Sequence, residues 1–310
     1  MSFTFKRNRW VCAALALILA GASPTLAQDV RVETQQQART RGQIAPAGEE
    51  TPEEVADPEL GDIRLVARAP RPKILTLYTG QIFNFTSNAF LTRDDEQQAF
   101  FWNGRVGAVF IPYATRNFTP RLTFEQNWFR YDHLSELDFD SQNLGLDLKY
   151  DLNPEDTWSV NASYAPARLY SRQGEFYRYG LANASITLFR PIGEAPVYLL
   201  VTAGAYSRNG DPSSSDRVAA YLNVVALYNL GEQVQLTAIA RPEVQHYTHD
   251  PSGSSREDFN IAVGGAISWN PNKYLSVGAT AAYVGNFSNL GERRYDLVTP
   301  SVLVSAQFAF

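Results

Sequence analysis

The chain has 310 residues, with 27 Lys and Arg, 32 Asp and Glu and 3 His, so its formal net charge is −5 at neutral pH. An acidic chain is a poor partner for nucleic acid, and one Cys with three His leaves little material for a disulfide framework or a metal site. The composition therefore predicts no nucleic-acid partner, no metal and no cofactor.

The first 27 residues have the layout of a secretory signal peptide. Lys6, Arg7 and Arg9 form a positive start, an apolar stretch follows, and small residues lead to Ala27. The apolar stretch is too short to span a membrane as a helix. We predict cleavage after Ala27, which removes the only Cys, the only Met and three basic residues. The mature chain then carries 24 Lys and Arg against 32 Asp and Glu, a net charge of −8.

Residues 28–73 contain no aromatic residue and are rich in Pro, Glu, Gln and Arg. Such a segment cannot bury enough apolar area to offset the entropy lost on ordering, so we predict a disordered N-terminal tail. Three roles stay open for it. It is a plain spacer, a docking peptide for a partner, or a plug for a pore.

From residue 74 to the end, aromatic residues become dense and apolar residues alternate with polar ones. Period-two alternation predicts half-buried β-strands. Tight breaks rich in Gly, Pro, Asn and Asp, such as 152–156 and 270–273, alternate with longer polar breaks, such as 170–175 and 208–216. Between the breaks lie twelve predicted strands, at 74–86, 99–112, 120–132, 141–151, 157–169, 176–190, 197–207, 217–228, 234–248, 258–269, 274–287 and 295–310.

Each predicted strand has one apolar and one polar face. In 141–151, Leu144 and Leu146 share one face, while Asp147 and Lys149 share the other. Aromatic residues gather near both ends of the strands, as in the interfacial girdles of membrane barrels. Near the tight breaks these are Phe110, Tyr150, Trp158, Tyr228, Trp269, Tyr274 and Phe310; near the longer breaks they are Phe100, Trp102, Trp128, Tyr164, Phe259 and Tyr283.

The last ten residues, SVLVSAQFAF, alternate strictly and end on an aromatic residue. With the twelve-strand pattern and the signal peptide, they make residues 74–310 resemble Gram-negative outer-membrane β-barrel proteins. The resemblance implies an all-β fold, a transmembrane up-and-down antiparallel barrel of about 12 strands in the cell outer membrane. It also implies that the 28–73 tail lies in the periplasm, that lipid and lipopolysaccharide surround the barrel, and that Phe308 and Phe310 signal to the barrel-assembly machinery.

A closed barrel constrains the seam between its first and last strands and the prolines inside its strands. The last strand must pair with the strand that begins near residue 74, because an open edge in lipid leaves backbone groups unsatisfied. Pro166, Pro242 and Pro300 lie inside predicted strands, where each removes a hydrogen-bond donor. We predict bulges or shorter strands at these three positions.

The inward parity places polar and charged residues in the lumen. Counting from the breaks puts Arg105, Glu125 and Asp147 on neighbouring strands at similar depth, with Lys149 one diagonal step away. Two interpretations are compatible: a polar eyelet that sorts solutes, or an ion-pair network that stiffens the wall. The mixed signs argue against strong charge selectivity. The predicted pore-lining residues are Arg105, Glu125, Asn127, Asp147, Lys149, Asn223, Arg241, Glu243 and Gln245.

The rim beside the longer breaks holds weaker candidates. Asp132 with His133, and His249 with Asp250, have the residue types of a hydrolytic site, which needs a base oriented beside a nucleophile. Loop ends collect such residues without any chemistry, and we favour that interpretation. Five arginines near the same side are candidates for pairing with lipopolysaccharide phosphates, although solvated loop charge is the simpler explanation. They are Arg208, Arg217, Arg256, Arg293 and Arg294.

The function predicted is that of a passive channel for small hydrophilic solutes, without enzymatic activity. One alternative is a rim hydrolase acting on lipid or peptide. Another is a structural or export component, for example in polysaccharide export, whose tail 28–73 docks a periplasmic partner.

Overall fold

The computed structural model describes residues 74–310 except 95, 116, 154–156, 194–195 and 250–254, together with 56–57 and 61–62. The predicted signal peptide and most of the predicted tail lie outside the described residues. Within the tail, β1 (Ala56–Asp57) and β2 (Gly61–Asp62) pair antiparallel. Within these described ranges, no helix is long and apolar enough to cross a membrane.

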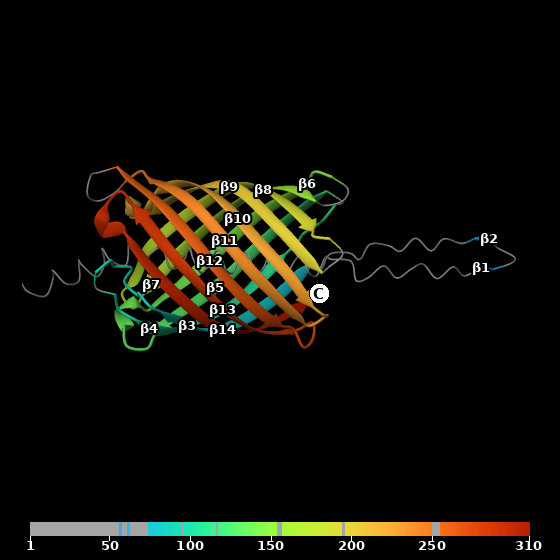
Figure 1. The fold of residues 1–310 in the computed structure, drawn as a ribbon, viewed down its shortest axis with the longest axis horizontal. Helices are drawn as coiled ribbons and strands as arrows, with labels where there is room; N and C mark the ends of the chain where they lie inside the picture. The colour runs from blue at the N-terminus through green and yellow to red at the C-terminus, as the bar shows by residue number, and fades with distance from the viewer. Residues whose placement is uncertain are drawn as a thin grey trace, which may run out of the picture.

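Twelve strands form one closed barrel, in which each strand pairs antiparallel with its neighbours (Figure 1). The predicted fold class is confirmed, and every predicted strand is present with ends that differ by at most four residues. The strands are β3 (Leu75–Thr86), β4 (Ala99–Phe110), β5 (Phe118–Tyr131), β6 (Phe139–Asp151), β7 (Trp158–Ser171), β8 (Gly174–Pro191), β9 (Val197–Asp211), β10 (Arg217–Leu230), β11 (Val234–Tyr247), β12 (Arg256–Trp269), β13 (Leu275–Ser288) and β14 (Tyr295–Ala309).

The seam between the last strand and the first barrel strand closes as predicted. The β14–β3 register runs from Ser301 opposite Asn84 to Ala309 opposite Thr76. The final residue takes part, since the Phe310 amide donates to the Leu75 carbonyl at 2.8 Å. The C-terminal residue is therefore part of the wall.

The three prolines interrupt the sheet less than predicted, and the expected shortening of the strands is wrong. Each proline keeps its register with one neighbouring strand, and pairing to the other neighbour is skipped or has ended at that point. Because a proline lacks only its own N–H, the loss stays local. The register shift recorded between β7 and β8 lies at Leu169 and Tyr170, not at a proline. The retained pairs are Pro166–Gly180, Pro242–Ile261 and Pro300–Ala281.

The two ends of the barrel differ (Figure 1). The tight turns and the C-terminus lie at one end, here named the turn end. The opposite, loop end carries the 3-10 helices η1 (Ser135–Leu137), η2 (Ser213–Ser215) and η3 (Gly291–Arg293).

One loop at the loop end is shorter than predicted. The segment 170–175 is a tight hairpin in which Ser171 pairs with Gly174. Gly174 has φ of +115°, a conformation that costs a glycine little. The strands β7 and β8 therefore continue into the segment predicted as a loop.

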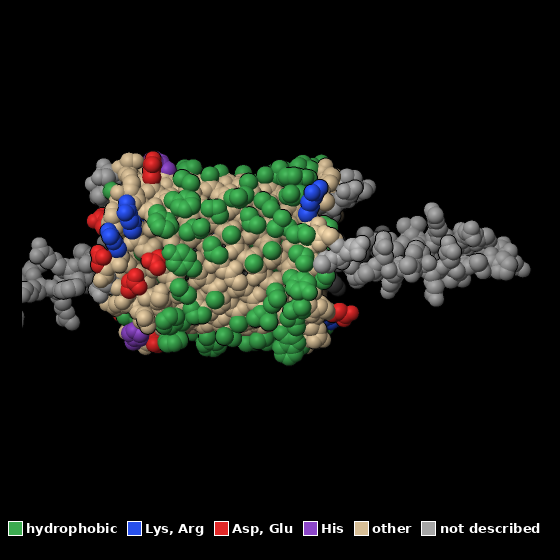
Figure 2. Space-filling model, viewed as in Figure 1, with side chains coloured by type: hydrophobic (Ala, Val, Ile, Leu, Met, Phe, Trp, Pro, Cys, Tyr) green, Lys and Arg blue, Asp and Glu red, His purple; other side chains and the backbone are tan. Residues whose placement is uncertain are grey.

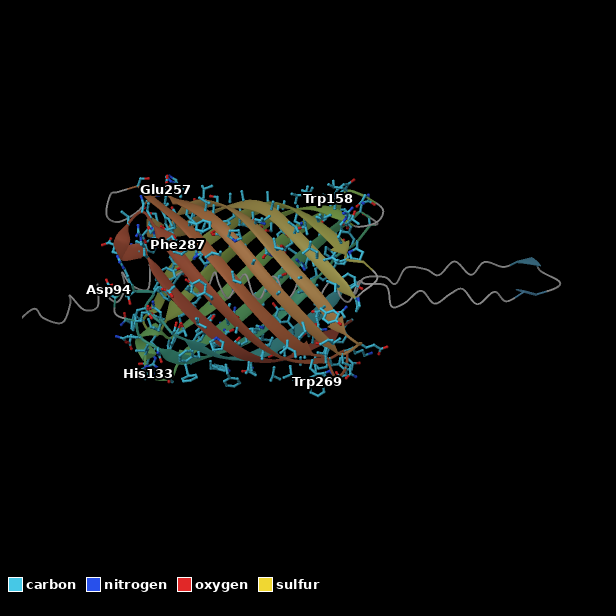
Figure 3. All side chains as sticks on the ribbon, in the orientation of Figure 1. Asp94, His133, Trp158, Glu257, Trp269 and Phe287 are labelled. Atoms are coloured by element: carbon cyan, nitrogen blue, oxygen red, sulfur yellow. The ribbon has the colours of Figure 1, made fainter. Side chains whose placement is uncertain are left out.

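The outer wall is apolar and the charges collect at its ends (Figure 2). Trp158 and Trp269 lie at the turn end and Phe287 near the loop end, all exposed (Figure 3). Along β12, Phe259 and Trp269 are ten residues apart, which corresponds to about 33 Å of strand and, at the tilt usual for membrane barrels, to about 23–27 Å of height. This matches the apolar band of a bilayer-spanning barrel.

Candidate functional site

Side chains of one parity on each barrel strand point into the lumen. In β6, Leu146 and Leu148 are exposed, whereas Asp147 and Lys149, which alternate with them, are half-buried. Since successive side chains alternate faces and the sheet is closed, the more buried parity is the inner face.

All nine predicted pore-lining residues lie on this inner face; their role in a pore stays a prediction. Glu125, Asp147 and Lys149 are half-buried. The buried members are Arg105, Asn127, Asn223, Arg241, Glu243 and Gln245.

On the β3–β5 wall, Glu125 is held by neutral donors. It accepts hydrogen bonds from the Tyr78 hydroxyl at 2.8 Å and from Asn127 Nδ2 at 2.9 Å. Arg105 lies opposite Asn127 in the β4–β5 register, with its guanidinium carbon 5.9 Å from the Tyr78 ring centre. Nε and Nη1 of Arg105 are buried and have no hydrogen-bond partner.

The predicted common depth of Arg105, Glu125 and Asp147 is wrong. Asp147 lies opposite Arg121, and Arg121 Nε is 3.5 Å from its carboxylate. Asp147 is therefore nearer the turn end than Glu125, because the stagger between β5 and β6 differs from a count along the chain.

Lys149 also finds a partner at the turn end, Asp151, at 2.7 Å. Arg121 and Asp151 were missing from the predicted set. Arg121 shares the odd parity of Glu125, so the alternation contained the signal that placed it inside.

The predicted pairing of Arg241 with Glu243 is present and belongs to a larger network. Arg241 Nη2 lies 2.9 Å from Glu243 Oε2. Gln245 Nε2 donates to Glu243 at 2.7 Å, and the Tyr206 hydroxyl donates to it from β9. Arg241 also stacks on the ring of Tyr221, 4.1 Å from its centre. The network is buried, where charges need partners at close range, and these contacts provide them.

Three arginines predicted on the loop-side surface are inside the barrel instead. Arg208 and Arg217 are each 2% exposed and Arg256 is 5% exposed. β9 and β12 extend further toward the loop end than predicted, so Arg208 and Arg256 fall within strands, and all three have inward parity. These three side chains are therefore not exposed on the outer surface, where they were predicted.

Tyrosine rings hold these buried arginines. Arg208 stacks on Tyr179 at 3.9 Å from the ring centre, and Arg256 stacks on Tyr247 at the same distance. The guanidinium carbon of Arg217 lies 5.5 Å from the centre of the Tyr247 ring. Arg256 also pairs with Asp258. Cation–π contacts of this kind stabilise a desolvated guanidinium.

The remaining two arginines of that set stay near the loop end. Arg293 belongs to η3, and exposed Arg294 follows it, with Nε donating to the Ser288 carbonyl at 2.7 Å. Their contact with lipopolysaccharide stays a prediction.

The rim candidates form separate pairs. Asp132 contacts its neighbour His133 at the β5–β6 loop, whereas His249 lies 3.6 Å from Asp216, at the β11–β12 loop. Six strands separate the two loops around the barrel, so they do not make one site. Asp250 lies outside the described residues.

His249 lacks the geometry of a Ser–His–Asp triad, where acid and nucleophile contact different ring nitrogens. Thr248 Oγ1 is 3.1 Å from Nδ1 of His249, the same nitrogen that faces Asp216. Across the described ranges, no group of three or more His, Cys, Asp or Glu is placed to hold a metal ion.

No protein-family model and no curated protein sequence matches the chain. Among solved structures, an outer-membrane channel from Pseudomonas putida superimposes with a TM-score of 0.53 at 11% identity, covering 77% of this chain and 97% of that one. The chain has the fold of an outer-membrane β-barrel.

Other similar barrels include the translocator domain of autotransporter NalP from Neisseria meningitidis, with a TM-score of 0.48, 12% identity, and coverage of 93% of this chain and 99% of that one. LpxR from Salmonella typhimurium has a TM-score of 0.44, 8% identity, and coverage of 74% and 99%. At such identities the likeness concerns the fold, and function has to be argued from the barrel's own residues.

Proposed function

We propose that the protein is a passive channel of the Gram-negative outer membrane that passes small hydrophilic solutes. The proposal rests on the contrast between the two faces of the barrel. The outer wall is apolar with aromatic residues near both ends, whereas the inner face carries amides, hydroxyls and charges. A polar interior behind a lipid-facing exterior is the arrangement of water-filled barrels. An eight-stranded barrel is filled by its side chains, whereas twelve strands enclose a wider lumen.

Small residues line the middle of the lumen. Gly145, Ser163, Ser185, Gly264 and Thr280 point inward from five different strands, and all are half-buried. Small side chains leave room between facing walls. A narrow path for hydrated solutes follows from this lining.

Recordings in planar lipid bilayers test the proposal. The purified full chain is expected to give stepwise conductance increases whose size rises with salt concentration. A barrel that folds and inserts yet gives no conductance would contradict the channel function.

The second candidate, a rim hydrolase, draws on the contact between Asp132 and His133. His133→Ala and His249→Ala are expected to leave conductance unchanged, because both side chains are exposed at the loop end. Loss of a lipid- or peptide-cleaving activity in either variant would favour the hydrolase.

Several further parts of the proposal concern location and partners. Residues 1–27 are removed on export, and 28–73 extend into the periplasm, where they serve as a spacer, meet a docking partner or reach the pore mouth. Phe308 and Phe310 act as the signal for the barrel-assembly machinery. Retention of a co-purifying partner by the full chain, and its loss on deletion of 28–73, would identify the tail as a dock.

A further inference from the structure

We propose that the buried arginines Arg208, Arg217 and Arg256, here named the arginine wall, attract anions into the loop-end half of the lumen. The solutes of this channel are then small anions such as carboxylates. This inference rests on the proposed channel function.

The inner face of the described strands carries an excess of two positive charges. Seven cationic side chains point inward: Arg105, Arg121, Lys149, Arg208, Arg217, Arg241 and Arg256. Five carboxylates do so: Glu125, Asp147, Asp151, Glu243 and Asp258. The complete chain has the opposite sign, −5. The positive lumen is therefore a consequence of which residues face inward, not of composition.

The excess lies in the loop-end half. In the turn-end half, each cation has its own carboxylate, Arg121 with Asp147 and Lys149 with Asp151. Two buried loop carboxylates, Asp138 and Asp216, lie above the strands and are not part of this count. Asp138 accepts from the Tyr131 amide and pairs with Arg172, and Asp216 accepts from the Gly210 amide.

The arginine wall retains unused donors. Arg208 Nε and Arg217 Nη2 are buried and have no hydrogen-bond partner. Both guanidinium groups lie near tyrosine rings, and Arg217 Nε also donates to the Tyr206 hydroxyl at 3.2 Å, yet neither group has a carboxylate partner at close range. On the opposite wall, six strands from β10, Arg105 has two such nitrogens. Guanidinium groups without a carboxylate partner keep their positive charge and attract anions in the lumen through their field.

Burial strengthens the effect on permeating ions. Charges within a low-dielectric wall are screened less than surface charges, and a lumen bounded by such walls focuses their field. Anions inside the loop-end half of the lumen are therefore attracted by its inner face before they reach the balanced turn-end half.

The reversal potential under a KCl gradient tests the inference. The wild-type channel is expected to prefer chloride over potassium by about twofold or more at roughly 0.1 M salt, and to lose most of that preference near 1 M, where the screening length falls from about 10 to about 3 Å. Citrate added on the loop side is expected to reduce the chloride current.

Two variants locate the source of the preference. The double variant Arg208→Gln with Arg217→Gln removes the excess and is expected to bring the two permeabilities to about equal values. Should that variant fail to fold, Asn183→Asp serves instead. Asn183 is half-buried, faces inward and accepts a hydrogen bond from Tyr221 that an aspartate also accepts. It is expected to lower the preference by about half.

The matched control is Arg168→Gln with Arg178→Gln. These arginines lie on β7 and β8 but face outward, with 61% and 58% of their side chains exposed. Removing the same two charges there is expected to leave the reversal potential unchanged. Conductance without chloride preference in the wild type would overturn the anion inference and leave the channel standing, whereas absence of conductance would overturn both.

Discussion

Glu243 shows how single residues stabilise the inner wall. It is 5% exposed and accepts hydrogen bonds from Arg241, Gln245 and Tyr206. Removal of one partner from a buried, charged network leaves the others uncompensated, and this costs far more than loss of an exposed pair.

Glu243→Gln is therefore expected to lower the free energy of unfolding by about 3 kcal/mol, because Arg241 loses its counter-charge. Urea unfolding in detergent micelles, followed by the shift between folded and unfolded bands on gels, measures it. The matched control is Glu257→Gln on β12, whose carboxylate is 69% exposed and 3.7 Å from His246. Equal losses in the two variants would show that the network adds nothing.

Along a single strand, alternate side chains face two different environments, the lipid and the lumen. Leu146 on β6 is exposed on the outer wall, whereas Asn143 on the same strand points inward opposite Glu125. A charge therefore has a different cost at two positions three residues apart.

Leu146→Arg is expected to destabilise the barrel in liposomes by about 2–4 kcal/mol, since it places a guanidinium in the hydrocarbon region. Asn143→Arg is expected to cost less than about 1 kcal/mol, because the new charge lies opposite Glu125. Unfolding curves of both variants in the same lipid provide the comparison. A larger loss for the inward variant would show that the assigned faces are inverted.

The last strand has a structural role at the seam, and we propose an assembly role for it as well. Backbone bonds from Phe310 close the seam, while its side chain is 65% exposed. The seam contacts of this residue and its proposed role in assembly can therefore be tested separately.

Phe310→Ala is expected to refold in detergent with a change below about 0.5 kcal/mol, because the backbone bonds persist. In cells it is expected to reduce the folded protein recovered from outer membranes several-fold. Phe100→Ala, which truncates a similarly exposed aromatic on β4, is the control. Equal recovery of the two variants would remove the special role of the C-terminal residue.

At the scale of the whole molecule, the aromatic girdles fix the barrel's position in a bilayer. Trp158 and Trp269 both lie at the turn end, on different sides of the barrel, and both are exposed on the outer wall (Figure 3). Indole rings favour the headgroup region, so both should lie shallow in the membrane.

Variants that retain only Trp158 or only Trp269 are expected to be quenched more by lipids brominated near the headgroup than by lipids brominated near the bilayer centre. Fluorescence in liposomes measures this. Absence of quenching by any brominated lipid would contradict membrane insertion.

The sequence by itself determined the strands and their faces. Alternation has a period of two along one strand, and turn residues mark its ends, so both are local properties. Because open strand edges are costly in lipid, the twelve strands had to close into a barrel, and the β14–β3 seam followed.

The tertiary structure decided what depends on relations between strands. The stagger of neighbours places Asp147 beside Arg121 rather than level with Glu125. Extension of β9 and β12 beyond the predicted ends, with inward parity, turns Arg208 and Arg256 from surface charges into buried ones. Stagger and strand extension arise from hydrogen bonds between segments distant in sequence, which no local pattern encodes. The charge of the lumen was therefore decided only when the barrel closed.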